Sequence, residues 1–299
     1  MNKFFAFIAT VFSAATFLTA CENDEVQDAV IDYGPPVKIN VSAGIQTRAV
    51  NSAWTANDAI GVFSMNGTAA EYANMQYITS DGDGNFTAAT EDDVVWLPSD
   101  GSSRSVLAYY PYVTGCDGTY SIDVSDQTDQ EAIDFMVSPA VNNVNKTQPN
   151  VAFVFSHKLV KIQLNIRSGD GITAEQLANM NVTLSNQYTT ATCDVLTDAD
   201  VDVTGTEVST LSFMTSADGT TSEAIVLPAS TTEGMLLQFE LPEVGTYSWA
   251  ISNSANSQSF EMGNRYIYNV NVGKTSIIVT SQIEDWAAGN GSGEDVNAE

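Results

Sequence analysis

The chain has 299 residues, of which 43% are hydrophobic and 16% charged, a composition typical of folded proteins. Asp and Glu number 37 against 10 Lys and Arg, which gives a formal net charge of -27. A surface of that sign repels phosphate backbones, so the composition excludes nucleic acid as a partner. It also disfavours anionic membrane surfaces, so any membrane attachment has to be covalent or hydrophobic. The length allows two domains, each with its own core.

Residues 1–21 have the layout of a secretory signal, with an early Lys3, an apolar run over Phe4–Leu18 and small residues before Cys21. The run is shorter than the roughly 20 residues that a spanning helix needs. The ending Leu18-Thr19-Ala20-Cys21 resembles a bacterial lipobox, in which the cysteine is diacylated and becomes the mature N-terminus. We therefore predict lipidation at Cys21, with a plain secretory signal as the alternative. Glu22–Glu25 opens an acidic tether over 22–36 and resembles signals that export some Gram-negative lipoproteins to the outer face.

The stretch Val37–Ala49, VKINVSAGIQTRA, alternates between apolar and polar or small residues, as a half-buried strand does. Its apolar positions are Val37, Ile39, Val41, Ala43 and Ile45. Arg48 follows this strand and is the only arginine in the first hundred residues. A trypsin-like cut between Arg48 and Ala49 would detach a core strand, leaving an apolar groove and unpaired backbone that another subunit's strand could fill. The alternative is a surface arginine after an ordinary first strand.

Further short apolar or alternating segments, separated by turns rich in Asp, Gly, Asn, Ser and Thr, predict an all-β fold of sandwich type. We expect strands at Ala59–Ser64, Met75–Thr79, Val94–Leu97, Ser105–Tyr112, Thr119–Val124, Val151–Ile166, Val182–Leu184, Ala191–Leu196, Leu211–Met214, Glu223–Leu227, Met235–Leu241, Tyr247–Ile251, Ser259–Met262, Tyr266–Val272 and Ile277–Thr280.

The alternation in Val151–Ile166 changes phase between His157 and Lys161, which predicts a β-bulge. Thr173–Asn179 is the one short helix we expect, with Thr173 as its cap. Asn142–Asn150 is polar and linker-like, so we place a domain boundary there. The predicted divisions are a sandwich over 37–148, a second over 149–286 and a flexible tail over 287–299.

The sequence shows no GxSxG motif, no Cys/His pairing and no glycine-rich phosphate loop. Its many acidic residues leave a glycosidase-like pair open, but none can be singled out. Asp81–Asn85 begins like a calcium loop, but Phe86 replaces the glycine and Asp92 the final glutamate, so a glycine-rich hairpin turn is predicted. The single histidine, His157, lies in an alternating strand and is expected to be structural. Cys116 and Cys193 are expected to be free, buried thiols. We predict neither enzymatic activity nor a cofactor.

Several features in order along the chain resemble the fimbrillin-like (Mfa-like) subunits of type V pili. They are Thr47-Arg48-Ala49, Trp54 with Asp58, Ile60-Gly61-Val62-Phe63, Ala108-Tyr109-Tyr110-Pro111-Tyr112, then Phe155, His157, Leu159, Lys161 and Ile162, then Gly263, Tyr266 and Tyr268, and Ile283 with Trp286. One departure is Asn57, where the family tends to carry Gly; Asn also tolerates positive φ, so the turn should survive.

The resemblance implies two tandem transthyretin-like β-sandwich domains and export as an outer-membrane lipoprotein anchored through Cys21. It implies that an arginine-specific protease cuts between Arg48 and Ala49, that Val37–Ile45 is displaced, and that subunits polymerise into fimbriae by strand exchange. The partners are then other fimbrial subunits, and the donor strand is either a neighbour's Ile277–Trp286 or another segment, since this stretch can equally sit in its own sheet. Adhesion to host or bacterial surface glycans or proteins would follow from such a role.

A different class of function stays open at this point, namely a surface lipoprotein that does not polymerise and binds glycans. Exposed aromatic side chains would serve as its stacking platforms. The candidates are Trp54, Trp96, Tyr109, Tyr110 and Trp249.

Overall fold

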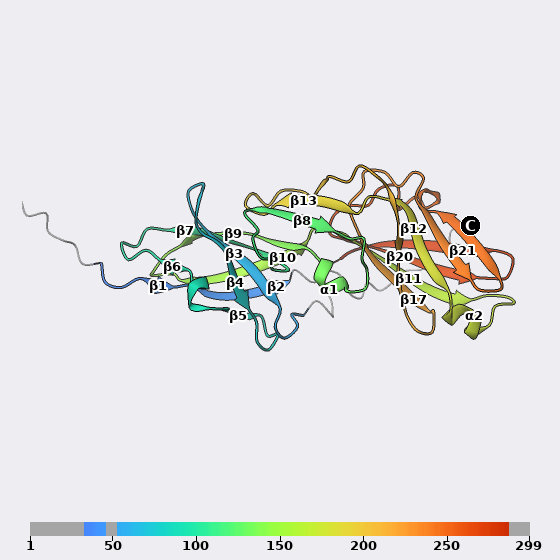
Figure 1. Ribbon diagram of the computed structural model, residues 1–299, viewed down its shortest axis with the longest axis horizontal. Helices are drawn as coiled ribbons and strands as arrows, with labels where there is room; N and C mark the ends of the chain where they lie inside the picture. Colours follow the sequence, from blue (N-terminus) through green and yellow to red (C-terminus); the bar gives the residue numbers. More distant parts are fainter. Residues whose placement is uncertain (1–32, 46–52, 287–299) are drawn as a thin grey trace, which may run out of the picture. The chain divides into compact units, whose positions relative to one another are not determined.

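The computed structural model describes residues 33–45 and 53–286, and from Gly34 onward these belong to one compact unit (Figure 1). The prediction of an all-β fold is confirmed. Helical segments in these ranges are short: η1 (Glu91–Asp93), α1 (Gln130–Ile133), α2 (Ala174–Ala178) and η2 (Ile251–Asn253). None of the helices in the described ranges is long and apolar enough to cross a membrane. The predicted sites Cys21, Arg48 and Ala49 lie outside the described residues.

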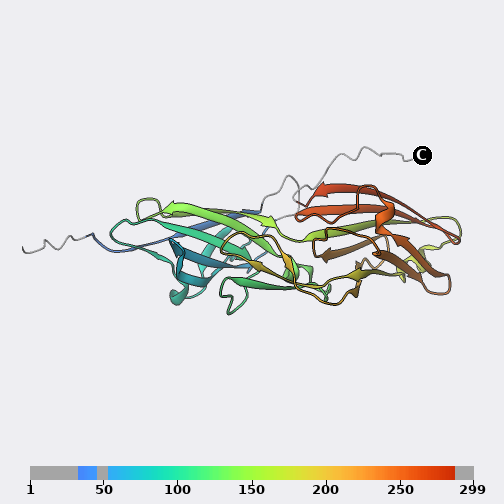
Figure 2. The ribbon, with the colours of Figure 1, turned by 90° about the horizontal axis from the view of Figure 1, so that it is seen from above.

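Strands from the first half of the chain close into a seven-stranded barrel, seen in two directions in Figures 1 and 2. In order around the barrel they are β10 (Asn150–His157), β2 (Asn40–Ile45), β5 (Asn85–Ala88), β4 (Ala69–Ile78), β3 (Ala59–Asn66), β7 (Arg104–Tyr110) and β9 (Met136–Val144). A separate two-stranded pair joins β1 (Val37–Lys38) to β6 (Trp96–Leu97). The barrel has its own apolar core, which includes Ile60, Val62 and Phe153.

Strands from the second half form two sheets with a common core. The five-stranded sheet has the order β16 (Met214–Thr215), β17 (Thr221–Val226), β11 (Val160–Ser168), β20 (Asn264–Val272) and β21 (Ile277–Asp285). The four-stranded sheet has the order β15 (Ser209–Ser212), β12 (Asn181–Gln187), β18 (Leu236–Leu241) and β19 (Gly245–Ala250). Leu164 and Tyr268 of the first sheet and Leu184 and Phe239 of the second belong to one buried cluster, as in a sandwich.

A three-stranded sheet connects segments from both halves of the chain. It consists of β14 (Asp202–Val203), β13 (Thr190–Asp194) and β8 (Thr119–Asp123). Tyr120 of β8 is opposite Cys193 of β13, and Ile122 is opposite Ala191. This contact between segments about 70 residues apart could not be read from local sequence patterns. Cys116 and Cys193 are both free and buried, as predicted.

The long segment predicted as one bulged strand is two strands in different sheets. β10 pairs with β2 and β9 in the barrel, whereas β11 pairs with β17 and β20. Between them, the N–H of Lys158 donates to the carbonyl of Phe135 at 3.0 Å. The bulge prediction was therefore wrong: the phase changes because the chain leaves one sheet and enters another.

The linker predicted at Asn142–Asn150 is the hairpin between β9 and β10, closed by a bridge between Asn145 and Gln148. β9 was not predicted, because its sequence MVSPAVNNV contains Pro139, which disfavours a strand, and the polar pair Asn142 and Asn143. The division into domains at 148–149 stays a prediction, but the pairing of β10 assigns residues 150–157 to the barrel.

Most remaining strands lie where they were predicted, within a few residues. At Ser259–Met262 the described chain forms only an isolated bridge, between Ala229 and Phe260. The predicted helix is confirmed as α2, in which Thr173 Oγ1 accepts from the N–H of Gln176 at 3.2 Å and Gln176 Oε1 accepts from the N–H of Thr173 at 3.0 Å.

Candidate strand-exchange site

The predicted displaced strand, Val37–Ile45, is two strands in the structure: β1 pairs with β6 outside the barrel, and β2 is a strand of the barrel. Ile39, Val41 and Ala43 are buried, whereas Lys38, Asn40, Ser42 and Gly44 are exposed and Val37 and Ile45 are partly buried. The alternation predicted from the sequence is thus confirmed in the structure. Its cause is the two-residue period of a strand with one face against the barrel core.

β2 makes more backbone pairs with one of its neighbouring strands than with the other. Six consecutive positions, Asn40 to Ile45, are in parallel register with Asn150–Phe155 of β10. On the other side only Val41 and Ser42 have antiparallel partners, in β5, and the N–H of Ala43 donates to the carbonyl of Gly84 at 2.8 Å. β10 therefore provides most of the backbone pairing that β2 would lose on leaving.

The barrel core to which β2 contributes includes several aromatic side chains. Its buried residues share a core cluster with Trp54, Phe86, Phe153 and Phe155, the last two on β10. Without β2 these rings would border an open groove flanked by the unpaired edges of β5 and β10. Such a groove fits an extended segment with apolar residues at every second position.

Trp54, which follows the segment 46–52 in the sequence, holds the C-terminal end of β2. Its indole N–H donates to the carbonyl of Ala43 at 2.8 Å. Its ring packs edge-on against Phe86, Tyr110 and Phe155, with centroids 5.1, 5.3 and 5.3 Å away. The sequence marks Trp54 only as part of the family resemblance and as a candidate exposed platform. It does not indicate that Trp54 is buried and bonded to β2.

The turn that follows Trp54 is held by Asp58. Its carboxylate accepts from the N–H of Thr55 at 2.6 Å and from the hydroxyl of Tyr110 at 3.1 Å. Burial, and then the nearby Asp58, raise the pKa of Tyr110, so this hydroxyl stays a donor. Asn57 has φ of 75°, which confirms that asparagine adopts the positive φ required there.

The glycine-rich turn before β5 closes over the same end of β2. A Cβ on Gly84 would lie 2.6 Å from the carbonyl oxygen of Ala43, and one on Gly82 would lie 2.5 Å from that of Trp54. Both glycines also have positive φ, so the close approach and the backbone require them together. The Asp83 carboxylate accepts from the side chain and backbone of Asn85, which lowers its pKa. Among the described residues no group of three or more His, Cys, Asp or Glu could hold a metal ion.

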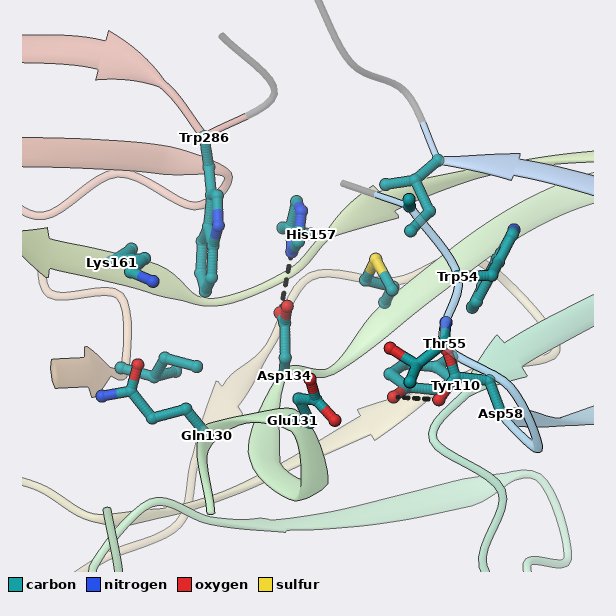
Figure 3. Close-up of a pocket in the computed structure, with 14 residues that line it drawn as sticks. Trp54, Thr55, Asp58, Tyr110, Gln130, Glu131, Asp134, His157, Lys161 and Trp286 are labelled. Carbon is teal, nitrogen blue, oxygen red and sulfur yellow. Dashed lines mark hydrogen bonds and ion pairs between the residues drawn. The ribbon is translucent and has the colours of Figure 1, made fainter. Parts of the chain in front are cut away.

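A pocket of about 250 Å³ lies beside the ends of the segment 46–52, since Ile45 and Ala53 both line it (Figure 3). His157 lines it as well, with Nδ1 2.7 Å from Asp134 Oδ1 and the ring stacked on Trp286 at 4.2 Å and 4°. The imidazole is 7% exposed. These contacts support the prediction that His157 is a structural residue.

The five aromatic residues considered as glycan platforms differ in exposure. Trp54, Tyr109 and Tyr110 are buried, and the Tyr109 hydroxyl donates to Asn74 Oδ1 at 2.6 Å. Trp249 is partly buried and lies edge-on to Tyr268. Of the five candidates Trp96 alone is exposed, at 41%, and one isolated ring is a weak basis for a sugar site.

The chain is thus an all-β protein in which β2, near the N-terminal end of the described residues, completes a closed barrel. The fimbrillin-like family matches residues 47–286 of the chain. A candidate fimbrium subunit of Bacteroides uniformis, Fim1C, is 42% identical over 274 residues, covering 88% of this chain and 89% of the relative. The chain belongs to the fimbrillin-like family.

Solved structures agree with this assignment. A crystal structure of a candidate cell adhesion protein from Bacteroides uniformis is 38% identical with a TM-score of 0.76, covering 83% of this chain and 99% of the other. Another from Bacteroides ovatus is 27% identical with a TM-score of 0.68, covering 85% and 99%. The family relates the chain to fimbrial subunits of the cell surface.

Proposed function

We propose that this chain is a fimbrial subunit that assembles by strand exchange after cleavage between Arg48 and Ala49. The observation that carries the proposal is the position of β2. It is a complete barrel strand at the N-terminal end of the fold, and the segment 46–52, which contains Arg48, joins it to the rest of the barrel. One cut in that segment leaves β2 attached by non-covalent contacts alone.

Energetics explain why a cut strand needs a replacement. Burial of Ile39 and Val41 stabilises the barrel by about 1.5–3 kcal/mol each, and the parallel ladder to β10 adds further hydrogen bonds. A cut by itself therefore does not release β2. A strand from another subunit with the same alternation regains both the apolar burial and the hydrogen bonds. The free-energy change of the exchange is therefore close to zero, and mass action can drive it.

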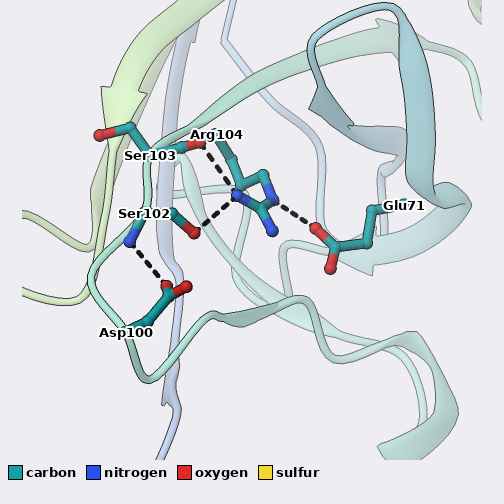
Figure 4. Close-up of polar contacts among 5 residues, drawn as sticks. All are labelled: Glu71, Asp100, Ser102, Ser103 and Arg104. Atoms are coloured by element: carbon teal, nitrogen blue, oxygen red, sulfur yellow. Dashed lines mark hydrogen bonds and ion pairs between the residues drawn. The ribbon is translucent and has the colours of Figure 1, made fainter. Parts of the chain in front are cut away.

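The arginines within the described residues are poor protease sites. Arg104 lies in β7, Arg167 in β11 and Arg265 in β20, each with its backbone in a ladder. Figure 4 shows Arg104 paired with Glu71 and in contact with Ser102. Arg104 is 8% exposed, and its guanidinium donates to the hydroxyl of Ser102 at 3.1 Å. Proteases cleave extended, unpaired backbone, so cleavage at these three positions requires local unfolding.

The test is limited digestion of residues 22–299 with an arginine-specific protease, followed by intact mass and size-exclusion chromatography. We expect a single early cut after Arg48 and a ladder of oligomers. Arg48→Ala should abolish both, and Arg167→Ala, a matched control in a paired strand, should behave like the parent chain. A cut product that stays monomeric would contradict the proposal.

The anchor is a second part of the same proposal. Cys21 would be diacylated and hold the subunit to the outer membrane before assembly, and because each buried CH₂ contributes about 0.8 kcal/mol, several chains give stable attachment. Metabolic labelling with a palmitate analogue tests it. The parent chain should take up label and Cys21→Ser should take up none; equal labelling would refute lipidation at this residue.

Adhesion is the expected use of the assembled fimbria, since two similar solved structures are candidate cell adhesion proteins. Cells that carry the parent chain should bind host or bacterial surfaces more strongly than cells that carry Arg48→Ala. Equal binding by both kinds of cell would show that adhesion does not depend on assembly.

A further inference from the structure

A cleft of about 830 Å³ runs beside the N-terminal part of the displaced strand. One wall comes from Lys38 and Asn40, the other from Phe86, Ala88 and Glu91, and Trp96 also lines it. This cleft is separate from the position that β2 itself occupies in the barrel.

The cleft exists because the chain changes partners. From Ala43 to Val41, β2 follows β5, but the N–H of Ile39 donates to the carbonyl of Val95 at 3.1 Å, and Val37 and Lys38 pair with β6. β2 and β5 therefore diverge on the N-terminal side of Val41. At the other end of β2 the turn at Gly84 and the indole of Trp54 close the barrel.

Ala88 lines the cleft and, among the described residues, has no register partner in β2. In the β4–β5 ladder, Ala88 is opposite Tyr77, and the N–H of Ala89 donates to the carbonyl of Gln76 at 2.9 Å. Hydrogen-bonded and non-bonded pairs alternate in an antiparallel ladder, so the N–H and C=O of Ala88 point away from β4. Continued register with β2 would give Ala88 the partner Ile39, which is bound to Val95 instead.

We propose that this cleft is the docking site at which an incoming strand first binds, before it replaces β2. The occupant is an extended strand of another fimbrial subunit, running antiparallel to β5, with apolar residues at alternate positions as in Val37–Ile45. It pairs first with Ala88, then takes the pairing of Phe86 and Asn85 from β2, and displaces β2 toward Ile45. The inference rests on the proposed strand exchange and adds where and in which direction the exchange begins.

The hydrogen bonding of Ala88 distinguishes the docked state from the fully exchanged state. A strand that has fully replaced β2 bonds as β2 does, and β2 has no register partner at Ala88. The Ala88 N–H therefore contributes to the docked state and not to the exchanged state. Ala88→Pro removes this N–H without loss to the β4 ladder, whereas Ala88→Ser retains it and is the matched control.

The experiment uses a fluorescent peptide with the sequence of residues 37–45 and the chain 22–299 cut after Arg48. Ala88→Pro should take up the peptide about two- to tenfold more slowly than Ala88→Ser, as expected for one hydrogen bond, and reach the same final occupancy. Equal rates would overturn the docking site and leave strand exchange standing. If the cut parent chain takes up no peptide, both proposals fall.

A second measurement covers the case in which Ala88→Pro does not fold. Hydrogen exchange of the uncut parent chain, with and without the same peptide, should show slower exchange of the Ala88 amide when the peptide is present. Unchanged exchange at Ala88 at saturating peptide would overturn the docking site.

Discussion

Trp54 provides a direct test of how the barrel holds the end of β2. Its indole N–H is 2.8 Å from the carbonyl oxygen of Ala43, and the residue is 8% exposed. Trp54→Phe keeps an aromatic ring but removes the donor and leaves a buried carbonyl without it. Loss of one partner of a buried hydrogen bond costs about 1–3 kcal/mol of unfolding free energy. Trp54→Ala also removes the edge-on contacts with three rings, and we expect a loss of about 3–5 kcal/mol.

The assay is equilibrium unfolding in urea, with the free energy taken from the midpoint and slope. Trp96→Phe is the control, since Trp96 is 41% exposed and its replacement should change the free energy by less than about 0.5 kcal/mol. A change this small for Trp54→Phe would refute the view that the indole bond fastens β2. After cleavage at Arg48, Trp54→Phe should also exchange β2 for an added strand faster than the parent chain does.

Three further predictions concern the turns and thiols. Asn57→Ala should cost about 1–2 kcal/mol of unfolding free energy because φ there is 75°, while Asn57→Gly should be tolerated; equal effects in urea unfolding would count against this. A hydrogen bond from Ser216 and others from Thr220 lower the pKa of Asp218 from 3.8 to about 2, so its stabilising effect is present above pH 3.8 and disappears as the pH falls through 2. The stability difference between parent and Asp218→Asn should shrink over that range, and a constant difference would contradict it. Burial raises the pKa of the Cys193 thiol to about 11, so neither it nor the buried Cys116 should react with a thiol reagent at pH 8 before unfolding; rapid labelling of the folded chain would be the contrary result.

Local patterns predicted the fold class and the face that the segment Val37–Ile45 buries. The alternation of Val37–Ile45 identified Ile39, Val41 and Ala43 as core residues, because one-sided burial imposes a period of two on a strand. The cap of α2 was equally readable, since Thr173 and Gln176 satisfy each other's backbone N–H groups.

Partner choice could not be read from the same patterns. The change of phase after His157 is consistent with either a bulge or a change of sheet, and only the pairing of β10 with β2 distinguishes them. The cleft beside Lys38 likewise depends on Ile39 bonding to Val95, a contact between residues 56 positions apart. Such non-local pairing is set by the whole fold and leaves no periodic signal in either segment.

The central claim is that release of β2 permits assembly, and a reversible lock between β2 and β5 tests it most directly. Ser42 and Asn85 are opposite each other, both exposed, at the position next to Ala43, whose N–H donates to the carbonyl of Gly84. Their Cα atoms should be about 4.5 Å apart, which suits a disulfide. The variant Ser42→Cys/Asn85→Cys, cut after Arg48, should remain monomeric when oxidised and form oligomer ladders on reduction. The cut parent chain should form ladders under both conditions. Ladders from the oxidised variant would show that assembly does not require β2 to leave and would contradict the account.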